Sequence, residues 1–218
     1  MKVVLIPVKN PNNAKQRLTS QLSPDQRRNL VWAMLQDVTR SVCQSTTPDR
    51  VVVVSSSESV IHHAIHHGWD VIQETEQVSE SESVDSSAQL LQSQGASALL
   101  RLPADIPLLQ AKDIDSLLNL ELQPESAILV PSHDQTGTNA LLRNPPGAFP
   151  SRFGENSLSL HQKEAGEKGV QCTIIQNPRI ALDLDELPDL LRFHSLKSQT
   201  QTAELLEQFD CIQETSLG

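Results

Sequence analysis

Aromatic residues are scarce in this sequence. Its 218 residues include no tyrosine, two tryptophans and four phenylalanines. Proteins that bind single-stranded nucleic acid stack the bases on aromatic side chains, so this composition argues against such a platform. The hydrophobic share of 38% must supply the core largely through Val, Ile and Leu side chains.

Cysteine is also rare, and positive charge is in deficit. Cys43, Cys172 and Cys211 are widely separated and form no Cys-x-x-Cys pair, which argues against a disulfide framework and a zinc site. The formal net charge of -10 repels nucleic acid and anionic membranes. We therefore expect neither as a partner, and any phosphate site must be a local cluster of Lys and Arg.

The sequence lacks a hydrophobic run of the length that a secretion signal or a membrane span requires. The apolar run at residues 3–8 contains Pro7 and ends at Lys9. No internal stretch has the composition of a linker, so we expect one domain over 1–218, with a tail of uncertain order after about residue 210. A cytoplasmic protein is expected, and its oligomeric state, a homodimer included, is not fixed by the sequence.

Short β-branched runs alternate with helical patterns along the chain. We expect strands at residues 3–6, 51–54, 69–72, 98–102, 127–131, 140–142 and 170–175. We expect helices at residues 23–42, 59–67, 86–94, 112–118, 157–165, 188–195 and 203–209. Segment 74–85 is rich in carboxylates and serines and is expected to be a solvated loop. This alternation predicts an α/β fold, a single-domain Rossmann-like, mostly parallel sheet flanked by helices.

Three cations lie close together after the first expected strand. Lys9, Lys15 and Arg17 fall within nine residues of a chain that has 17 Lys and Arg in total. Such a cluster could neutralise a triphosphate and the charge that develops during its transfer. A solvated basic loop is the alternative. The loop has no glycine, which excludes the Walker phosphate-binding loop and the dinucleotide fingerprint.

Aspartates follow two later segments. Asp105 lies between two prolines just after an expected strand, and open α/β sheets bind ligands at the carboxyl ends of their strands. Asp183 and Asp185 form an Asp-Leu-Asp pair. Magnesium prefers such hard oxygen ligands, so these residues are candidates for a metal site. The pair also resembles the short acidic motif of glycosyltransferases, and Asp185 could instead cap the following helix.

Two segments of small polar residues could hold an anion. One contains Thr138 and Asn139 after Gly137, and the other contains Gly154 and Ser157. Backbone N–H groups beside glycine can approach an anion, and Ser157 is expected at a helix N-terminus. Ordinary turn chemistry would explain either segment as well.

Four histidines and one cysteine are weaker candidates for functional residues. His62 and His66, like His63 and His67, lie four residues apart on one expected helix, but no acidic or cysteine partner is near them in the sequence. We expect an exposed helix there and no metal site. Cys172 lies in an expected strand without a base, so we do not expect a nucleophile.

In their order and spacing, these segments resemble the CofC family, the guanylyltransferases of coenzyme F-420 biosynthesis, which have the nucleotide-diphospho-sugar transferase fold. The resemblance runs from Ile6 to about Leu190. The segments that carry it are Pro7-Val8-Lys9, Ala14-Lys15-Gln16-Arg17-Leu18, Ala104-Asp105-Ile106-Pro107-Leu108, Gly137-Thr138-Asn139-Ala140-Leu141, Arg152-Phe153-Gly154 and Leu182-Asp183-Leu184-Asp185.

The resemblance implies that 2-phospho-L-lactate, phosphoenolpyruvate or 3-phospho-D-glycerate attacks the α-phosphorus of GTP and releases pyrophosphate, with Mg²⁺ as cofactor. It implies catalytic roles for Lys15, Arg17 and Asp105. Magnesium would bind Asp105 with Asp185 or Asp183, the former being favoured. The implied nucleotide contacts are Pro7, Val8, Lys9, Lys15, Val84 and Asp85. The implied contacts to the phospho-acid are Thr138, Asn139, Gly154 and Ser157.

One segment departs from the family pattern. Residues 83–85 read Ser-Val-Asp, where the family has a Gly-Leu-Asn-like segment associated with the base and ribose. Guanine specificity is therefore less firmly implied than nucleotidyl transfer. Two alternatives stay open: a glycosyltransferase that uses a nucleotide-sugar, and a nucleotide-binding relative that has lost activity.

Overall fold

A seven-stranded sheet forms the centre of the computed structural model, which describes residues 1–76, 78–121 and 123–215. The strand order is β3-β2-β1-β4-β6-β5-β7. The strands are β1 (Lys2–Pro7), β2 (Arg50–Ser55), β3 (Asp70–Gln73), β4 (Ala98–Arg101), β5 (Ser126–Pro131), β6 (Thr138–Asn144) and β7 (Gln171–Ile174). All neighbours pair in parallel except β6, which runs antiparallel to both β4 and β5. The expected mostly parallel α/β sheet is therefore confirmed.

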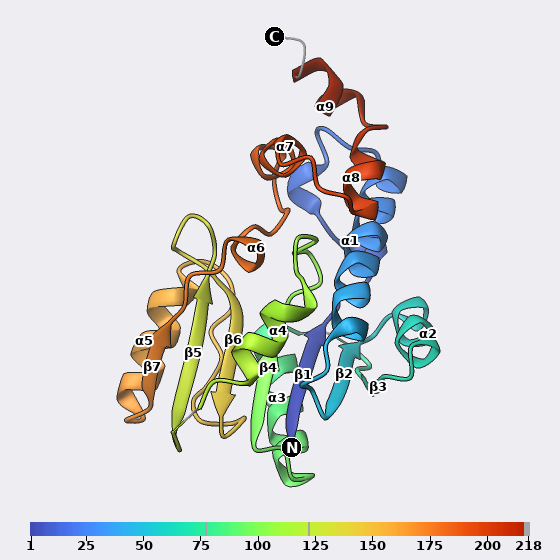
Figure 1. Ribbon diagram of the computed structural model, residues 1–218. Coiled ribbons are helices and arrows are strands. Elements are labelled where there is room, and N and C mark those ends of the chain that lie inside the picture. Colours follow the sequence, from blue (N-terminus) through green and yellow to red (C-terminus); the bar gives the residue numbers. More distant parts are fainter. Residues whose placement is uncertain (77, 122, 216–218) are drawn as a thin grey trace.

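Helices cover the sheet on both faces and extend beyond its upper edge (Figure 1). They are α1 (Pro24–Gln44), α2 (Glu58–His66), α3 (Glu80–Ser93), α4 (Ala111–Leu118), α5 (Ser157–Glu167), α6 (Pro178–Ala181), α7 (Leu187–Ser195), α8 (Gln201–Leu206) and α9 (Asp210–Thr215). Two short 3₁₀ helices, η1 (Pro11–Asn13) and η2 (Gln16–Leu18), follow β1. None of the helices within the described residues is long and apolar enough to cross a bilayer.

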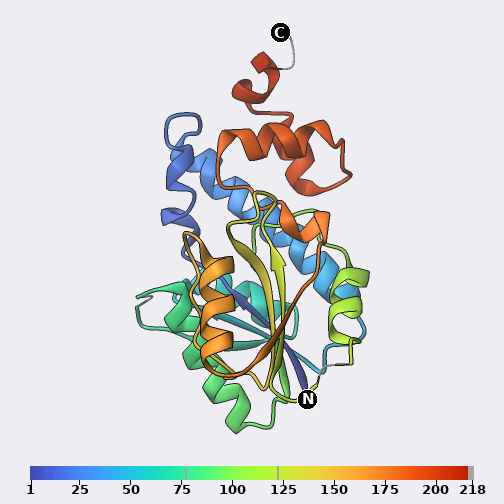
Figure 2. The same ribbon diagram turned by 90° about the vertical axis from the view of Figure 1, so that its left-hand side faces the viewer.

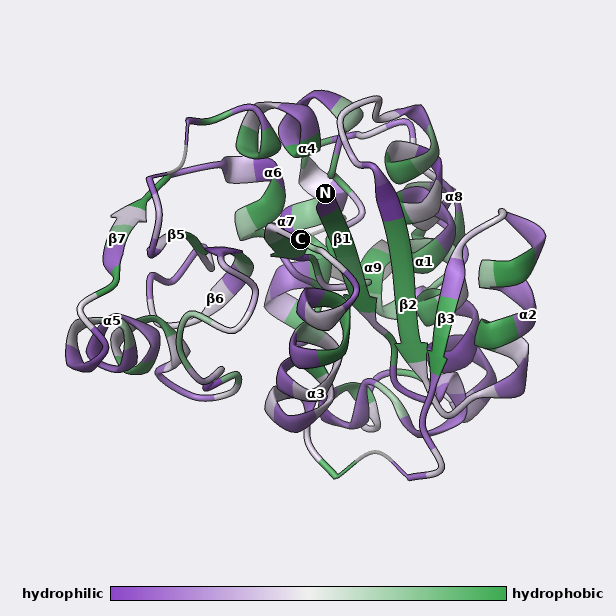
Figure 3. Cartoon of the chain, turned by 90° about the horizontal axis from the view of Figure 1, so that it is seen from below, coloured by the Kyte–Doolittle hydropathy of each residue, from purple (hydrophilic) through white to green (hydrophobic). Residues whose placement is uncertain are grey.

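The alternation of side chains along each strand divides the core into two layers. In β4, Leu100 packs with residues of α1 and α4 on one face, and Leu99 packs with residues of α3 on the other. Figure 3 shows β1 and β2 hydrophobic over most of their length, while the surrounding helices carry hydrophilic outer faces. The central strands are thus covered on both sides, as their continuous apolar sequences predict.

The expectation of a loop over residues 74–85 is wrong for its second half, because α3 begins at Glu80. Ser79 is the N-cap, and its hydroxyl accepts a hydrogen bond from the Glu82 amide at 3.1 Å. Acidic residues in a first turn are favoured by the helix dipole. The charges that suggest a solvated segment therefore mark a helix start instead, and Val84 lies fully buried one turn further on.

The pairing of β5 with β6 contains a bulge. Val130 pairs with Ala140 and Pro131 pairs with Thr138, so that Asn139 has no opposite residue in β5. A bulge frees one residue from the ladder and changes the direction of the neighbouring side chains. The bulge lies at the edge of the sheet where the parallel strands end, close to α6 in Figure 1.

The C-terminal helices α7 to α9 form a separate layer above this edge, which Figure 2 shows from the side. Their apolar residues, including Phe193, Leu206 and Ile212, pack with Leu30 and Met34 of α1. Part of the expected C-terminal tail, residues 216–218, lies outside the described residues.

A buried carboxylate joins α8 to α1. Asp37 is 3% exposed and accepts hydrogen bonds from the Gln201 and Thr202 amides, both at 2.9 Å, and from the Thr202 hydroxyl at 2.7 Å. These amides belong to the first turn of α8, where backbone donors have no partner within the helix. Asp37 therefore caps α8 from another helix.

Replacement of Asp37 by Ala should lower the free energy of unfolding by about 2–3 kcal/mol, because it leaves buried donors of α8 unpaired. Urea unfolding followed by circular dichroism measures this loss. Asp25→Ala is the matched control, since Asp25 is an exposed α1 carboxylate paired with Arg28, and it should cost less than about 1 kcal/mol. Equal losses in the two variants would contradict the capping role.

Candidate active site

The chain after β1 turns sharply to bring Lys15 inward. Lys15 adopts a left-handed backbone conformation, with φ 53° and ψ 44°, immediately before η2. This conformation is unfavourable for a residue other than glycine, so the surrounding structure must hold it in place. It leaves the side chain of Lys15 only 7% exposed.

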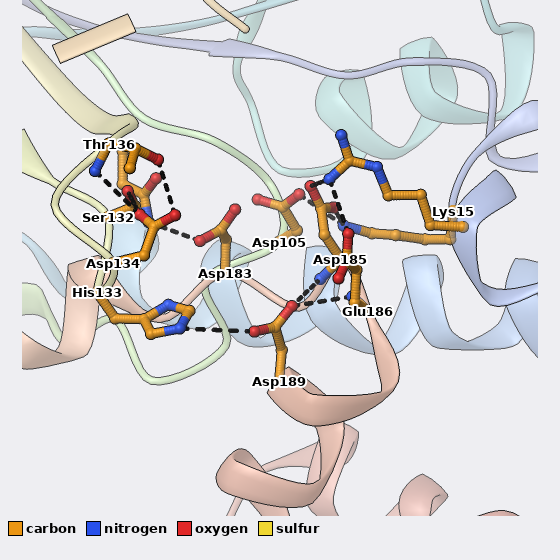
Figure 4. A network of polar contacts seen from close by, with 12 residues as sticks. Lys15, Asp105, Ser132, His133, Asp134, Thr136, Asp183, Asp185, Glu186 and Asp189 are labelled. Carbon is orange, nitrogen blue, oxygen red and sulfur yellow. Dashed lines mark hydrogen bonds and ion pairs between the residues drawn. The ribbon is translucent and has the colours of Figure 1, made fainter. Parts of the chain in front are cut away.

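The ammonium of Lys15 bridges two carboxylates from distant parts of the chain. Its Nζ lies 2.7 Å from Asp105 Oδ2 and 2.6 Å from Asp185 Oδ1 (Figure 4). Burial alone would lower the pKa of Lys15, but the two carboxylates raise it above its usual value. Burial would likewise raise the pKa of Asp105, yet Lys15 holds that pKa below its usual value. The site therefore contains a fixed cation between two anions.

Asp183 is the third carboxylate of the group, and Figure 4 shows it beside Asp105. Its Oδ1 accepts a hydrogen bond of 3.0 Å from Asn139 Nδ2. Burial and the charges of Asp105 and Asp185 raise the pKa of Asp183 to about 6, although the bond from Asn139 opposes this. Negative charge is thus crowded on this side of Lys15.

Backbone contacts hold the Asp-Leu-Asp segment against the end of β4. The Leu184 amide donates to the Asp105 carbonyl at 3.1 Å. The residue that caps α7 is Glu186, in a capping box with Asp189, whose Oδ2 accepts from the Asp185 and Glu186 amides. The alternative in which the Asp185 side chain caps this helix is therefore wrong, because that side chain binds Lys15 instead.

A cavity of about 400 Å³ opens beside these residues. Lys9 and Arg17 lie on its lining with Lys15, and Arg17 Nη1 is 3.2 Å from Glu186 Oε1. Pro7 and Val8 line it as well. The structure thus brings the expected cations to one cavity, with Lys15 buried in the wall and Arg17 69% exposed.

Val84 and Asp85, expected from the resemblance to contact nucleotide, do not line this cavity in the described structure. Because α3 starts early, Val84 points into the core. Asp85 accepts from Arg143 Nη1 at 3.0 Å and from the Ser151 amide and hydroxyl at 2.8 and 2.7 Å. Asp85 therefore holds Ser151 in place, and Glu80 is the α3 residue that lines the cavity within the described part of the chain.

The residues expected to contact a phospho-acid lie together at the amino end of α5. The Thr138 amide donates to Ser157 Oγ at 2.8 Å, and the Ser157 amide donates to the Gly154 carbonyl at 3.2 Å. Gly154 has φ +118°, a conformation that other residues rarely adopt. The side-chain amide nitrogen of Asn139 is bonded to Asp183 and to the Ile180 and Ala181 carbonyls. None of the four residues expected to contact the phospho-acid is among the described residues that line the cavity.

Sequence reasoning missed two buried residues of this region. His161, on α5, contacts Thr138 Oγ1 through Nδ1 at 3.0 Å, and its Nε2 accepts from the Arg152 amide. Burial, with the charges of Arg143 and Arg101, lowers the pKa of His161 to about 3, so it is neutral. Arg101 is the second missed residue. The one feature that could have indicated it is its charge inside the otherwise apolar run of residues 98–102.

The histidines of α2 have more partners than their sequence suggests. His67 Nδ1 lies 3.9 Å from Cys43 Sγ, and His63 Nε2 lies 2.9 Å from Thr39 Oγ1. Cys43 lies on α1, 24 residues before His67, so spacing along the chain does not indicate this contact. In the described ranges no group of three or more His, Cys, Asp or Glu side chains is arranged as a metal cage, here or at the aspartates.

The aspartates nevertheless have the chemistry of a magnesium site. Asp105 Oδ1 is buried and has no hydrogen-bond partner, and Asp183 is crowded by its neighbouring carboxylates. Proteins commonly bind Mg²⁺ through one or two carboxylates, with substrate phosphates and water as the other ligands. A full protein cage is therefore not required, and these residues fit the ion.

The fold is shared with known nucleotidyltransferases. A protein from Desulfovibrio desulfuricans described as a nucleotide-diphospho-sugar transferase superposes with a TM-score of 0.78 at 16% identity, covering 98% of this chain and 97% of that one. A nucleotidyl transferase from a Methanothermobacter species gives a TM-score of 0.64 at 14% identity, covering 90% of this chain and 98% of that one. The nucleotide-diphospho-sugar transferase fold that the family resemblance implies is thus confirmed.

Sequence comparison is more specific. A phosphoenolpyruvate guanylyltransferase of Rubrobacter xylanophilus is 34% identical, over 88% of this chain and 92% of the relative. A 3-phospho-D-glycerate guanylyltransferase of Colwellia psychrerythraea is 34% identical over 93% of this chain and 95% of the relative. A 2-phospho-L-lactate guanylyltransferase of Methanothermobacter thermautotrophicus is 30% identical over 85% of this chain and 81% of the relative. Residues 1–216 match the model of the family described as guanylyl transferase CofC like. The chain therefore belongs to this guanylyltransferase family.

Proposed function

We propose that this protein transfers GMP from GTP to a small phospho-acid and releases pyrophosphate, as a step of coenzyme F-420 biosynthesis. The observation that carries the proposal is the Lys15 ammonium fixed between Asp105 and Asp185 beside a cavity lined by further cations. The names of the relatives support it, since they are guanylyltransferases of 2-phospho-L-lactate, phosphoenolpyruvate and 3-phospho-D-glycerate. These three acids are the candidate substrates.

The triphosphate would bind in the cavity against Lys9, Lys15 and Arg17. Lys15 is buried and already oriented, so its charge requires no rearrangement to act on a phosphoryl group. Lys9 and Arg17 have exposed side chains that can follow the outer phosphates. Catalysis by this loop is neutralisation of the negative charge that grows on the transferred and leaving phosphates.

The acceptor needs no base from the protein. A phosphate monoester is already anionic at neutral pH, so its oxygen can attack the α-phosphorus without losing a proton to a side chain. His161 is the buried histidine of this region, and its low pKa and its bond to Thr138 suit a structural role. The protein would act chiefly by alignment, with Thr138, Gly154 and Ser157 holding the phospho-acid.

Magnesium belongs to this proposal through the aspartates. Asp105 would hold the ion with Asp185 or Asp183, using the Asp105 oxygen that has no other partner. When bound, the ion would add charge neutralisation and a template for the phosphates. Asn139 and Lys15 would keep the carboxylates in place before substrate arrives.

Cellular location and partners remain predictions of the sequence. The net charge of -10 argues against nucleic acid and anionic membranes as partners, and a cytoplasmic location suits an enzyme that consumes GTP. GTP and the phospho-acid are the partners that the proposal requires.

The direct test is pyrophosphate release by purified protein with Mg²⁺, each of the four nucleoside triphosphates and each of the three phospho-acids. We expect release only when GTP and an acid are both present, and its loss when EDTA removes the metal. A coupled assay for the final conjugate detects a product that is unstable.

Two outcomes of that assay would contradict the proposal. Consumption of a nucleotide-sugar without pyrophosphate release would indicate a glycosyltransferase. Tight binding of GTP without turnover on any acid would indicate a nucleotide-binding relative without activity.

Replacement of Asp105 by Ala should lower kcat/KM by at least about 100-fold, the size typical of losing a principal electrostatic group. Lys15 keeps its contact with Asp185, so the variant should stay folded. The melting temperature and pyrophosphate release are measured together. Asp70→Ala, a partly exposed aspartate paired with Arg50 away from the cavity, is the control and should keep activity within about twofold. Near-normal turnover by Asp105→Ala would count against the site.

A further inference from the structure

Arg101 is a buried cation to which the family resemblance assigns no role. It is the last residue of β4 and is 6% exposed. Its side chain lies on the face of the sheet covered by α3, and it lines the cavity together with Glu80. Its neighbours in the sequence, Leu99 and Leu100 of the strand and Leu102 just after it, are all apolar and buried. A charge at this position needs a physical explanation.

Three contacts fix the guanidinium, and one of its three nitrogens makes no hydrogen bond. Nη1 donates to the Asn139 carbonyl at 2.8 Å, Nη2 pairs closely with Glu80, and Cζ lies 4.2 Å from the ring centroid of Phe153. The Asn139 carbonyl belongs to the bulge between β5 and β6. Nε of Arg101 is buried and has no hydrogen-bond partner. A buried unpaired donor on a cation is costly unless a ligand satisfies it.

Arg101 lines the same cavity as the triphosphate loop, but it comes from the end of β4 and not from the segment after β1. Lys9, Lys15 and Arg17 come from the segment after β1, whereas Arg101 stacks on Phe153, next to Gly154 of the expected phospho-acid segment. Asp105 lies four residues further along the same chain segment, and the charge of Arg101 helps to lower its pKa. Arg101 therefore lies between the reaction centre and the acceptor side.

The acceptor carries two anionic groups with different tasks. Its phosphate must face the α-phosphorus beside Lys15 and Asp105, since that oxygen is the nucleophile. Its carboxylate is then the group that needs a separate cation. Arginine binds carboxylates through a planar fork of N–H donors, and stacking on an aromatic ring fixes the plane of that fork.

We infer that Arg101 binds the carboxylate of the phospho-acid, with Phe153 as the positioning residue that stacks on its guanidinium. The inference rests on the proposed function and adds to it the group that selects carboxylic acceptors. The substrate carboxylate would take up the free Nε donor, while Glu80 and the Asn139 carbonyl keep their contacts with Nη2 and Nη1. The cavity would thus admit phosphate esters generally but bind firmly those with a neighbouring carboxylate.

The test compares Arg101→Leu, Arg101→Lys and Glu80→Gln with the wild type. Leu suits this strand, so the first variant should fold, and a melting curve checks it. Its KM for phosphoenolpyruvate should rise by about 10- to 100-fold, the size of one charge-assisted pair, while its KM for GTP changes by less than about threefold. Arg101→Lys should recover only part of the loss, because an ammonium lacks the planar fork.

Glu80→Gln separates ligand binding from a structural ion pair. If Arg101 binds the acid, this variant keeps the guanidinium and should hold its KM for phosphoenolpyruvate within about threefold of the wild type. If the pair only supports the fold, both single variants should lose stability and activity alike. Arg50→Leu, an arginine at the start of β2 that pairs with Asp70, is the matched control and should leave both KM values unchanged.

Calorimetric titration of phosphoenolpyruvate keeps this inference distinct from the proposed function. Turnover by the wild type with an unchanged KM for the acid in Arg101→Leu would overturn the inference and leave the function standing. Binding of phosphoenolpyruvate that depends on Arg101, without turnover on any acid, would support the inference and contradict the proposed function. Wild-type protein that does not bind the acid overturns both.

Discussion

The buried ammonium of Lys15 joins parts of the chain that are far apart in sequence. Asp105 lies 90 residues away and Asp185 lies 170 residues away, and each contributes one oxygen within 2.7 Å of the same nitrogen. Without that cation, three neighbouring carboxylates would repel one another, and that repulsion would favour their protonation. Lys15 keeps Asp105 ionised, and it does so from a strained backbone conformation that the surrounding loop must maintain.

Much of this arrangement could be predicted from the sequence because strand ends share an edge. The continuous apolar runs located the strands, and the aspartates and cations that follow them had to meet where parallel strands finish. The start of α3 was not predicted, because a run of carboxylates was interpreted as solvated although Ser79 is a strong N-cap. The direction of β6 was also missed, although residues 132–137 are too few for a crossover connection to a parallel strand.

Arg101 and His161 could not be recognised as site residues from one sequence. A single charged residue in a strand forms no sequence pattern from which a role can be inferred. The partners of Arg101 come from α3, from β6 and from Phe153. Only the fold brings these together. The same is true of Asp85, whose neighbours Arg143 and Ser151 are about 60 residues away in sequence, and which supports the acceptor side from outside the cavity.

The bulge at Asn139 has a geometric consequence for the whole edge of the sheet. In a regular strand, Thr138 would face the same layer as Ala140, which packs with α1 residues, yet Thr138 contacts His161 on α5. The extra residue inverts this alternation. It leaves the Asn139 carbonyl free to bind Arg101 and the Asn139 side-chain amide free to bind Asp183. Deleting one residue there would restore a regular ladder and rotate all three contacts out of place, although the core would lose no apolar side chain.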